Sequence, residues 1–339
     1  MTTPKASNPL LFNYEQLKQT KQTLAFRPDE DYARQKTAID QKFRELLKMP
    51  PLLEKCIPIT EDVDTSDPRF DEIRMTIETE PGFFVPAHLI YPKNITGKIP
   101  VVICLQGHTT GMHNSLGREM HPSKKPIDVP GDRDFAIQAV EHGYAAFVME
   151  QRGFGELSFK EGAVSCHELA WQMTLIGKTL LGQRLADISN ALTAILSTFD
   201  FLDETKVGIT GNSGGGTSSY YAACLDERIK VTMPSSAFCS VLESWGASYH
   251  CDCAYIHNML NFFEMGDLAV LIAPRYLIAV NGKFDHIQPY EAAEKEFEKV
   301  KMIYETAGFG NRCKFVSAPE GHRYYADLAW PEFERFIHA

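Results

Sequence analysis

The sequence lacks the features of membrane proteins and of disulfide-built secreted domains. None of its apolar runs approaches the roughly 20 residues of a membrane-spanning helix. The first residues, Met1 to Ala6, lead into polar sequence without the apolar stretch of a signal peptide. Eight cysteines among 339 residues are too few for a disulfide scaffold. We therefore expect a cytoplasmic protein with reduced cysteines.

Positive charge is also scarce. Lys and Arg number 34 against 44 Asp and Glu, which gives a formal net charge of -10. An acidic surface is poorly suited to phosphate backbones and anionic lipids. The sequence therefore predicts no nucleic-acid partner and no membrane partner, and it favours a small-molecule substrate. The oligomeric state is not determined by these features.

The cysteines show no complete metal-binding spacing. The segment His250-Cys251-Asp252-Cys253, with His257 close behind, offers soft ligands for zinc, but no second Cys-x-x-Cys pair accompanies it. We therefore expect packing thiols and no metal, and a zinc site in this segment is the alternative. The remaining cysteines that lie singly in apolar surroundings are expected to be core thiols: Cys56, Cys104, Cys224, Cys239 and Cys313.

The first part of the chain has a helical pattern. Residues from about 14 to 48 carry leucines and aromatic residues among charges, without the alternation of a strand. Met49-Pro50-Pro51 ends this pattern, because proline cannot continue a helix. We expect residues 1–70 to form a helical extension packed on one main domain of residues 71–339, with an insertion at about 238–267.

The main domain alternates between strand and helix patterns. Residues 74–79 and 83–91 alternate around Pro81-Gly82 and predict an antiparallel hairpin. Short apolar runs then alternate with helical stretches, which predicts a mostly parallel sheet covered on both faces. Strands are expected at 101–105, 145–149, 206–210, 231–233, 276–280 and 314–317, and helices at 133–141, 180–201, 215–225, 291–306 and 325–337.

Three long irregular stretches follow predicted strands, at about 109–130, 154–177 and 238–267. In open α/β sheets, ligands bind outside the carboxyl ends of the strands. These stretches are therefore expected to form the walls of a ligand pocket.

The most specific motif is Gly211-Asn212-Ser213-Gly214-Gly215, which follows an apolar strand and precedes a helix. A serine on a sharp strand-to-helix turn needs small residues two positions before and after it, and Gly211 and Gly215 meet that need. The turn places the N–H of Gly214 at a helix N-terminus, where it can stabilise negative charge developing on an oxygen. A phosphate loop is the alternative, but the Gly-Lys-Ser/Thr ending is missing. Ser213 is therefore the predicted nucleophile.

A serine hydroxyl is a weak nucleophile, so this turn predicts a carboxylate and a histidine further along the chain. Asp285 lies in the loop after the strand predicted at 276–280, and His322 follows the last predicted strand. Ser213, Asp285 and His322 form the predicted catalytic triad. The competing residues are the base candidate His286 and the weaker acid candidates Asp267 and Asp327.

A second N–H donor for the reacting oxygen is expected in the loop after the first central parallel strand. That loop reads Gln106-Gly107-His108, and the N–H of His108 is the predicted donor, together with that of Gly214. The imidazole of His108 is expected to shape the pocket. After the next strand, Glu150-Gln151-Arg152-Gly153-Phe154-Gly155 predicts a tight turn held by an ion pair.

These motifs, in this order, resemble the α/β-hydrolase superfamily, and within it the branch of acetyl xylan esterases, cephalosporin deacetylases and dienelactone hydrolases. The resemblance covers about residues 74–339. It implies an α/β-hydrolase fold with a mostly parallel central sheet, the nucleophile at Ser213, the acid at Asp285, the base at His322, and oxyanion amides at His108 and Gly214. Dienelactone hydrolases use a cysteine nucleophile, so the serine here disfavours lactone opening of that kind.

The resemblance implies a serine hydrolase that cleaves short-chain acyl or acetyl esters, carbohydrate esters among them, through an acyl-enzyme on Ser213 and without a cofactor. One alternative is a serine peptidase of the oligopeptidase type, although the chain leaves no room for the large gating domain of those enzymes. The other is a non-catalytic binding module on a hydrolase fold, against which the intact triad argues.

Overall fold

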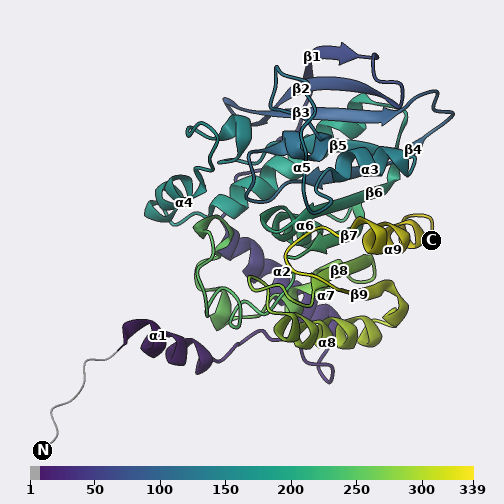
Figure 1. The fold of residues 1–339 in the computed structure, drawn as a ribbon. Helices are drawn as coiled ribbons and strands as arrows, with labels where there is room; N and C mark the ends of the chain where they lie inside the picture. Colours follow the sequence, from purple (N-terminus) through teal and green to yellow (C-terminus); the bar gives the residue numbers. More distant parts are fainter. Residues whose placement is uncertain (1–7) are drawn as a thin grey trace, which may run out of the picture.

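A computed structural model describes residues 8–339 of the chain. Its centre is a nine-stranded sheet in the order β1-β2-β3-β5-β4-β6-β7-β8-β9, with helices on both faces (Figure 1). This architecture confirms the predicted α/β-hydrolase fold. The strands are β1 (Pro58–Asp64), β2 (Phe70–Glu80), β3 (Phe83–Pro92), β4 (Ile99–Leu105), β5 (Ala145–Met149), β6 (Leu202–Asn212), β7 (Ile229–Ser235), β8 (Tyr276–Gly282) and β9 (Cys313–Ala318).

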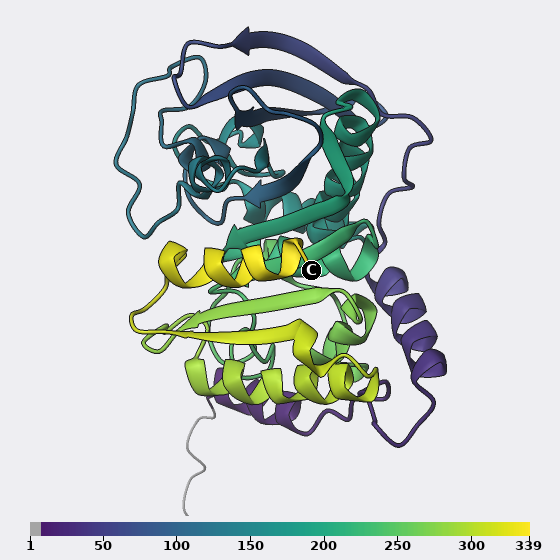
Figure 2. The same ribbon diagram turned by 90° about the vertical axis from the view of Figure 1, so that its right-hand side faces the viewer.

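The sheet is mixed, as the sequence predicts. Strands β1, β2 and β3 pair antiparallel at one edge, and β3 joins β5 in the same sense. From β5 through β4 to β9, each neighbouring pair is parallel. Figure 2 shows the purple and blue antiparallel strands at one edge and the green and yellow strands β8 and β9 at the other. The parallel part brings the carboxyl ends of its strands to one side, where a ligand site is expected.

Two buried clusters cover opposite faces of the sheet, because side chains alternate along each strand. On β4, Val101, Ile103 and Leu105 belong to the first cluster, whereas Val102 and Cys104 belong to the second. Helices α2 (Tyr32–Leu47), α5 (Leu180–Thr198), α6 (Gly214–Leu225) and α8 (Tyr290–Thr306) contribute to the first cluster, and α3 (Phe135–Glu141) and α9 (Ala326–Ile337) to the second. Burial on both sides explains the continuous apolar runs that predicted these strands.

The helices predicted in the main domain are all present, with ends shifted by a few residues. Across residues 8–339, no helix combines the length and the apolar character that crossing a bilayer requires. The helices are α1 (Pro9–Lys18), α2 (Tyr32–Leu47), α3 (Phe135–Glu141), α4 (Cys166–Leu175), α5 (Leu180–Thr198), α6 (Gly214–Leu225), α7 (Ala269–Ile272), α8 (Tyr290–Thr306) and α9 (Ala326–Ile337).

Apart from the single-turn helix α7 and the 3-10 turns, two elements of the structure were not predicted. Residues 58–64, which fall in the segment expected to be helical, form the edge strand β1, most of whose residues are exposed. Residues 166–175, expected to be irregular, form α4, in which only Cys166 and Ala170 are buried. Both elements bury few apolar side chains, so their hydrophobic periodicity is weak.

The N-terminal helices differ in how they attach to the main domain. Helix α2 buries Ile39, Phe43 and Leu47 in the first cluster. The backbone N–H of Phe26, which precedes α2, donates a 2.9 Å hydrogen bond to the buried carboxylate of Asp267. Helix α1 buries no residue completely, and its Tyr14 and Leu17 line a second cavity together with Trp245 of the 238–267 segment. The packing of α2 therefore anchors the extension.

Candidate active site

Ser213 lies on a tight turn between β6 and α6. Its backbone has φ 56° and ψ -123°, a conformation that costs free energy for a residue with a side chain. A Cβ built at Gly215 would lie 1.9 Å from the carbonyl oxygen of Leu105, and one at Gly211 would lie 2.6 Å from the same oxygen. Because the turn approaches the end of β4 so closely, both positions require glycine, as the sequence motif predicts.

Asp285 and His322 are in contact. The Nδ1 atom of His322 lies 2.7 Å from Oδ2 of Asp285, whose side chain is fully buried. Asp285 follows β8 and His322 follows β9, two neighbouring parallel strands. Because these strands end at the same edge of the sheet, the two side chains meet although 37 residues separate them.

The carboxylate of Asp285 is held in its charged form. Burial acts to raise the pKa of Asp285, but the hydrogen bond with His322 and those from the backbone outweigh it and hold the pKa below its ordinary value. The backbone N–H groups of Ile287 and Gln288 donate to Oδ1 at 2.9 and 3.0 Å. One carboxylate oxygen is thus fixed by the backbone, and the other is left for the imidazole.

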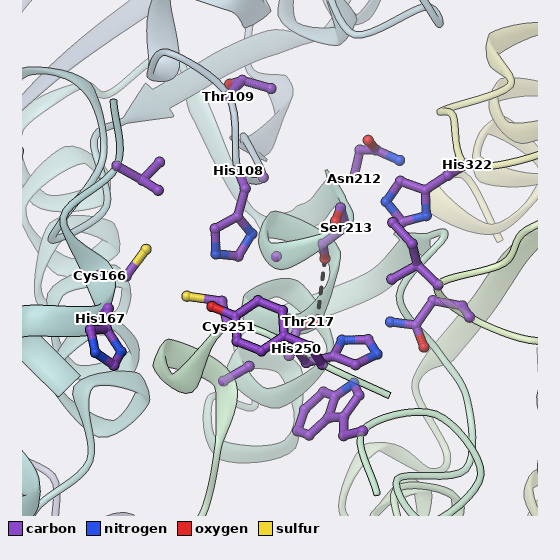
Figure 3. Close-up of a pocket in the computed structure, with 18 of the residues that line it drawn as sticks. His108, Thr109, Cys166, His167, Asn212, Ser213, Thr217, His250, Cys251 and His322 are labelled. Carbon is purple, nitrogen blue, oxygen red and sulfur yellow. Dashed lines mark hydrogen bonds between the residues drawn. The ribbon is translucent and has the colours of Figure 1, made fainter. Parts of the chain in front are cut away.

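Ser213 and His322 line the same cavity, which has a volume of about 500 Å³. Figure 3 shows Ser213 between His108 and His322. Among the hydrogen bonds of residues 8–339, none joins the side chains of Ser213 and His322. Such contacts are often long before substrate binds and tighten in the complex. The arrangement places a hydroxyl and a carboxylate-bound imidazole on one cavity wall.

The loop after β4 packs against the turn that carries Ser213. A Cβ at Gly107 would lie 2.6 Å from the carbonyl oxygen of Asn212 and 3.2 Å from the backbone nitrogen of Gly214. A Cβ at Gly214 would lie 3.0 Å from the ring of His108. In the described part of the chain, neither the N–H of His108 nor that of Gly214 donates a hydrogen bond. Both N–H groups are therefore available to a ligand next to Ser213.

Arg133 connects the loops around the site and was not recognised in the sequence as a site residue. Its guanidinium donates to Oδ1 of Asn212 and to the backbone oxygen of His322, both at 2.9 Å. It also lines the cavity. In the sequence, Arg133 stands at the start of a predicted helix, and nothing local distinguishes it from a surface arginine.

The competing triad candidates lie elsewhere. His286 and Asp327 are exposed. Asp267 is buried, but it accepts hydrogen bonds from the backbone of Phe26 and Glu264 and lies 3.5 Å from Nζ of Lys299. None of the three lines the cavity that contains Ser213. Asp267 therefore has a structural role in joining the N-terminal extension to the main domain.

The turn after β5 is held by buried charges, as expected. Arg152 pairs with Asp187 at 2.7 Å and with Glu80 at 2.8 Å. Glu150 is buried and accepts hydrogen bonds from the backbone N–H of Met112 at 3.1 Å and of Glu156 at 3.2 Å. Burial raises the pKa of Glu150 to about 7. The ion pair predicted for this turn is confirmed, and Glu150 additionally ties it to the loop after β4.

The three irregular stretches form the cavity walls, which confirms that prediction. They contribute Thr109, then Val164, Cys166 and His167, then Trp245, Tyr249, His250, Cys251 and Ala254. At this wall the side chains of His108, Cys166, Cys251 and Cys253 converge, with their ligand atoms all within 4.8 Å of one another. The sequence pointed to His250 and His257 beside the two neighbouring cysteines, whereas the structure brings Cys166 and His108 to them.

Comparisons with known proteins agree with this architecture. A family model described as Abhydrolase family matches residues 12–175, and one described as Acetyl xylan esterase (AXE1) matches residues 128–270. A curated relative from Bacillus subtilis (strain 168), named "Putative hydrolase YtaP", is 25% identical over 243 residues, which are 70% of this chain and 77% of the relative.

Two solved structures share the fold over nearly the whole chain. The structure of a "putative acetyl xylan esterase (BF1801)" from Bacteroides fragilis NCTC 9343 has a TM-score of 0.80 at 16% identity, covering 98% of this chain and 95% of that one. A glucuronoyl esterase from Solibacter usitatus has a TM-score of 0.65 at 14% identity, covering 99% and 98%. The two family-model matches, together with the shared fold, support the assignment of this chain to the acetyl xylan esterase-like branch of the α/β-hydrolases.

Proposed function

We propose that this protein is a serine esterase that hydrolyses short-chain acyl esters, acetyl esters of carbohydrates among them, through an acyl-enzyme on Ser213. One observation carries the proposal. Ser213, on its strained strand-to-helix turn, lines the same cavity as His322, which contacts the buried Asp285 at 2.7 Å. The three residues come from three separate loops. These are the nucleophile, the base and the orienting group that acyl transfer needs.

Acylation begins with the hydroxyl of Ser213. His322 takes the proton of Oγ through Nε2 while Oγ attacks the ester carbonyl carbon. The carboxylate of Asp285 accepts a hydrogen bond from Nδ1 of His322. Nδ1 therefore carries the proton of the neutral ring, and Nε2 is free to accept one. The N–H groups of His108 and Gly214 stabilise the negative charge on the former carbonyl oxygen. His322 then gives its proton to the leaving alcohol, and the acyl group remains on Oγ.

Deacylation repeats these steps with water. His322 removes a proton from a water molecule that attacks the acyl carbon, and the oxyanion forms again next to His108 and Gly214. Collapse of this intermediate breaks the bond to Oγ, and Ser213 recovers its proton from His322. The products are one carboxylic acid and one alcohol, and the enzyme returns to its starting state.

The cavity supports a small ester whose alcohol carries a sugar-like ring. Its volume of about 500 Å³ is in the range of small-molecule sites. Trp245, Tyr249 and His250 also line it, and aromatic side chains offer flat apolar surfaces beside polar groups. The match to the acetyl xylan esterase model favours a substrate in which the carbohydrate supplies the alcohol. In an ester such as a glucuronoyl ester, the carbohydrate supplies the acid instead.

The test compares Ser213→Ala with the unchanged chain on p-nitrophenyl esters of increasing acyl length and on acetylated sugars. We expect the unchanged chain to prefer acetyl esters and Ser213→Ala to lose turnover while keeping its fold. Ser248→Ala, which changes an exposed serine of the 238–267 segment, is the matched control and should keep its activity. Equal turnover in Ser213→Ala would reject the proposal.

Three further measurements separate the alternatives. Covalent labelling by a fluorophosphonate that is absent in Ser213→Ala supports a serine hydrolase, whereas no labelling of the unchanged chain supports a binding module. Cleavage of a peptide panel without ester turnover would support a serine peptidase. Hydrolysis of methyl glucuronate esters but not of acetyl sugars would replace the acetyl substrate with an ester of a sugar acid.

A further inference from the structure

Four soft ligands meet at the wall of the cavity. His108 comes from the loop after β4, Cys166 begins α4, and Cys251 and Cys253 come from the 238–267 segment. Nε2 of His108 lies 3.3 Å from Sγ of Cys253, and the four ligand atoms all lie within 4.8 Å of one another. Figure 3 shows the sulfur atoms of Cys166 and Cys251 turned toward the imidazole of His108.

The spacing fits one tetrahedral metal ion. Zinc binds thiolate sulfur at about 2.3 Å and imidazole nitrogen at about 2.0–2.1 Å. Tetrahedral geometry at those bond lengths separates the ligand atoms by about 3.5–3.8 Å, and small side-chain rotations bring the cluster to that spacing. Three thiolates and one imidazole are a ligand set of structural zinc sites, and softer sulfur ligands disfavour magnesium, calcium and manganese.

A buried positive charge next to the cluster, the guanidinium of Arg184, also favours an anionic group there. Arg184 is buried, its side chain donates hydrogen bonds to the backbone oxygen of Arg152 at 2.6 and 3.0 Å, and its guanidinium lies 4.3 Å from the ring centre of Phe154. Within residues 8–339, no carboxylate forms an ion pair with Arg184. The ionisable groups that act on its guanidinium are Cys253, Cys166 and Cys251. A buried cation without an anionic partner is strongly destabilising.

A zinc complex would satisfy that charge. When Zn²⁺ binds three thiols and one neutral imidazole, the thiols release three protons and the complex carries one negative charge. The guanidinium of Arg184 carries one positive charge, so the pair is neutral. Phe154, Leu180 and Ala170 pack around the two buried cysteines, whereas His108 and Cys251 reach the cluster from the cavity side.

We propose that His108, Cys166, Cys251 and Cys253 bind one zinc ion in a closed, structural site beside the catalytic cavity. With four protein ligands, the ion has no open position for water or substrate and takes no part in the ester chemistry. It joins the loop after β4 to α4 and to the 238–267 segment. Since His108 also supplies a backbone N–H next to Ser213, the zinc holds that N–H in place.

Zinc binding also determines which nitrogen of His108 carries the proton. Coordination through Nε2 leaves the proton on Nδ1. Nδ1 lies on the side of Gly214, where an added Cβ would approach it to 3.0 Å. The ring of His108 therefore presents a fixed donor toward the turn of Ser213, and not a mixture of two tautomers.

The test measures metal, not activity. The full chain is purified without chelator and without added metal, and its metal content is measured by plasma mass spectrometry. We expect about one zinc per chain, as in other sites with four protein ligands. Cys251→Ser should lower the zinc content severalfold. Cys313→Ser is the matched control, because this cysteine is also partly exposed and lies outside the cluster, and it should retain the metal.

A second measurement does not depend on how the variants fold. After removal of zinc from the unchanged chain, Co²⁺ should restore a tetrahedral site with the absorption of thiolate-bound cobalt. Failure to bind Zn²⁺ or Co²⁺ under reducing conditions, or a disulfide between two cluster cysteines there, would overturn the proposal. Ser213→Ala should lose turnover and keep its zinc, so the metal site and the esterase proposal can fail separately.

Discussion

The guanidinium of Arg133 bonds Oδ1 of Asn212 at 2.9 Å, and Asn212 is the residue directly before Ser213. The same guanidinium bonds the backbone oxygen of His322, also at 2.9 Å. Through these two bonds, Arg133 fixes the distance between the loop of the proposed nucleophile and the loop of the proposed base. Acyl transfer depends on that distance, because a misplacement of about 1 Å can cost about 100-fold in rate.

Arg133→Ala should lower kcat more than it raises KM, by about 10- to 100-fold in kcat. Arg133 takes no part in the proposed proton transfer. The expected loss arises because the two loops are no longer held in place. Steady-state kinetics on an acetyl ester measure the change. Arg335→Ala, which removes an exposed arginine paired with Glu332, is the control and should leave kcat unchanged. An Arg133→Ala variant with full kcat would show that the bonds to the two loops do not position the site.

Asp285→Asn should lower kcat by about 10³- to 10⁴-fold while the protein stays folded. The amide can present its N–H to Nδ1 of His322, which favours the tautomer that cannot accept the proton of Ser213. Rates and circular dichroism measured together distinguish this effect from unfolding. Asp327→Asn changes an exposed aspartate of α9 and serves as the control. A loss of rate in Asp327→Asn equal to that in Asp285→Asn would contradict the assignment of the acid.

Gly215→Ala should lower the free energy of unfolding by about 1–3 kcal/mol or prevent folding, because overpacking at a close backbone contact forces the chain apart. The added Cβ would lie 1.9 Å from the carbonyl oxygen of Leu105, which cannot move freely within β4. Urea unfolding measures the change. In Gly310→Ala, the nearest atom is Cγ of Glu305 at 3.2 Å, so that control should be nearly neutral. If Gly215→Ala were as stable as Gly310→Ala, α6 would be able to shift away from β4, contrary to this expectation.

Stability should depend on pH through Glu296. Burial raises the pKa of Glu296 from 4.5 to about 8, and the nearby Glu264 and Asp267 add to this effect against Lys299. Between these two pKa values, the folded protein holds a proton that the unfolded chain has released. The free energy of unfolding therefore falls as the pH rises from 4.5 to about 8.

Glu296→Gln should remove this contribution and make stability less dependent on pH, by an amount on the order of a few kcal/mol between pH 5 and 8. The glutamine oxygen can still accept the 2.7 Å hydrogen bond from the N–H of Gly266. Urea midpoints across this pH range measure the slope. Glu298→Gln, at an exposed position of the same helix, should leave the slope unchanged. An unaltered slope in Glu296→Gln would assign the pH dependence to other groups.

The sequence predicted the elements whose signals are local. Buried parallel strands such as β4 and β5 read as apolar runs, because both of their faces are covered. The turn at Ser213 was recognisable because its steric demand falls on glycines two positions away. Asp285 and His322 followed from their positions after predicted strands. By contrast, β1 and α4 bury few side chains, and their patterns were too weak to predict them.

The sequence by itself determined the class of fold, the strained turn and the order of the proposed triad, because each depends on neighbouring residues or on strand ends. Only the tertiary structure decided which distant loops meet. Arg133 reaches two loops, and Cys166 and His108 join Cys251 and Cys253. Such contacts depend on the order of strands in the sheet and on the paths of the long insertions, and residue spacing along the chain carries no information about either.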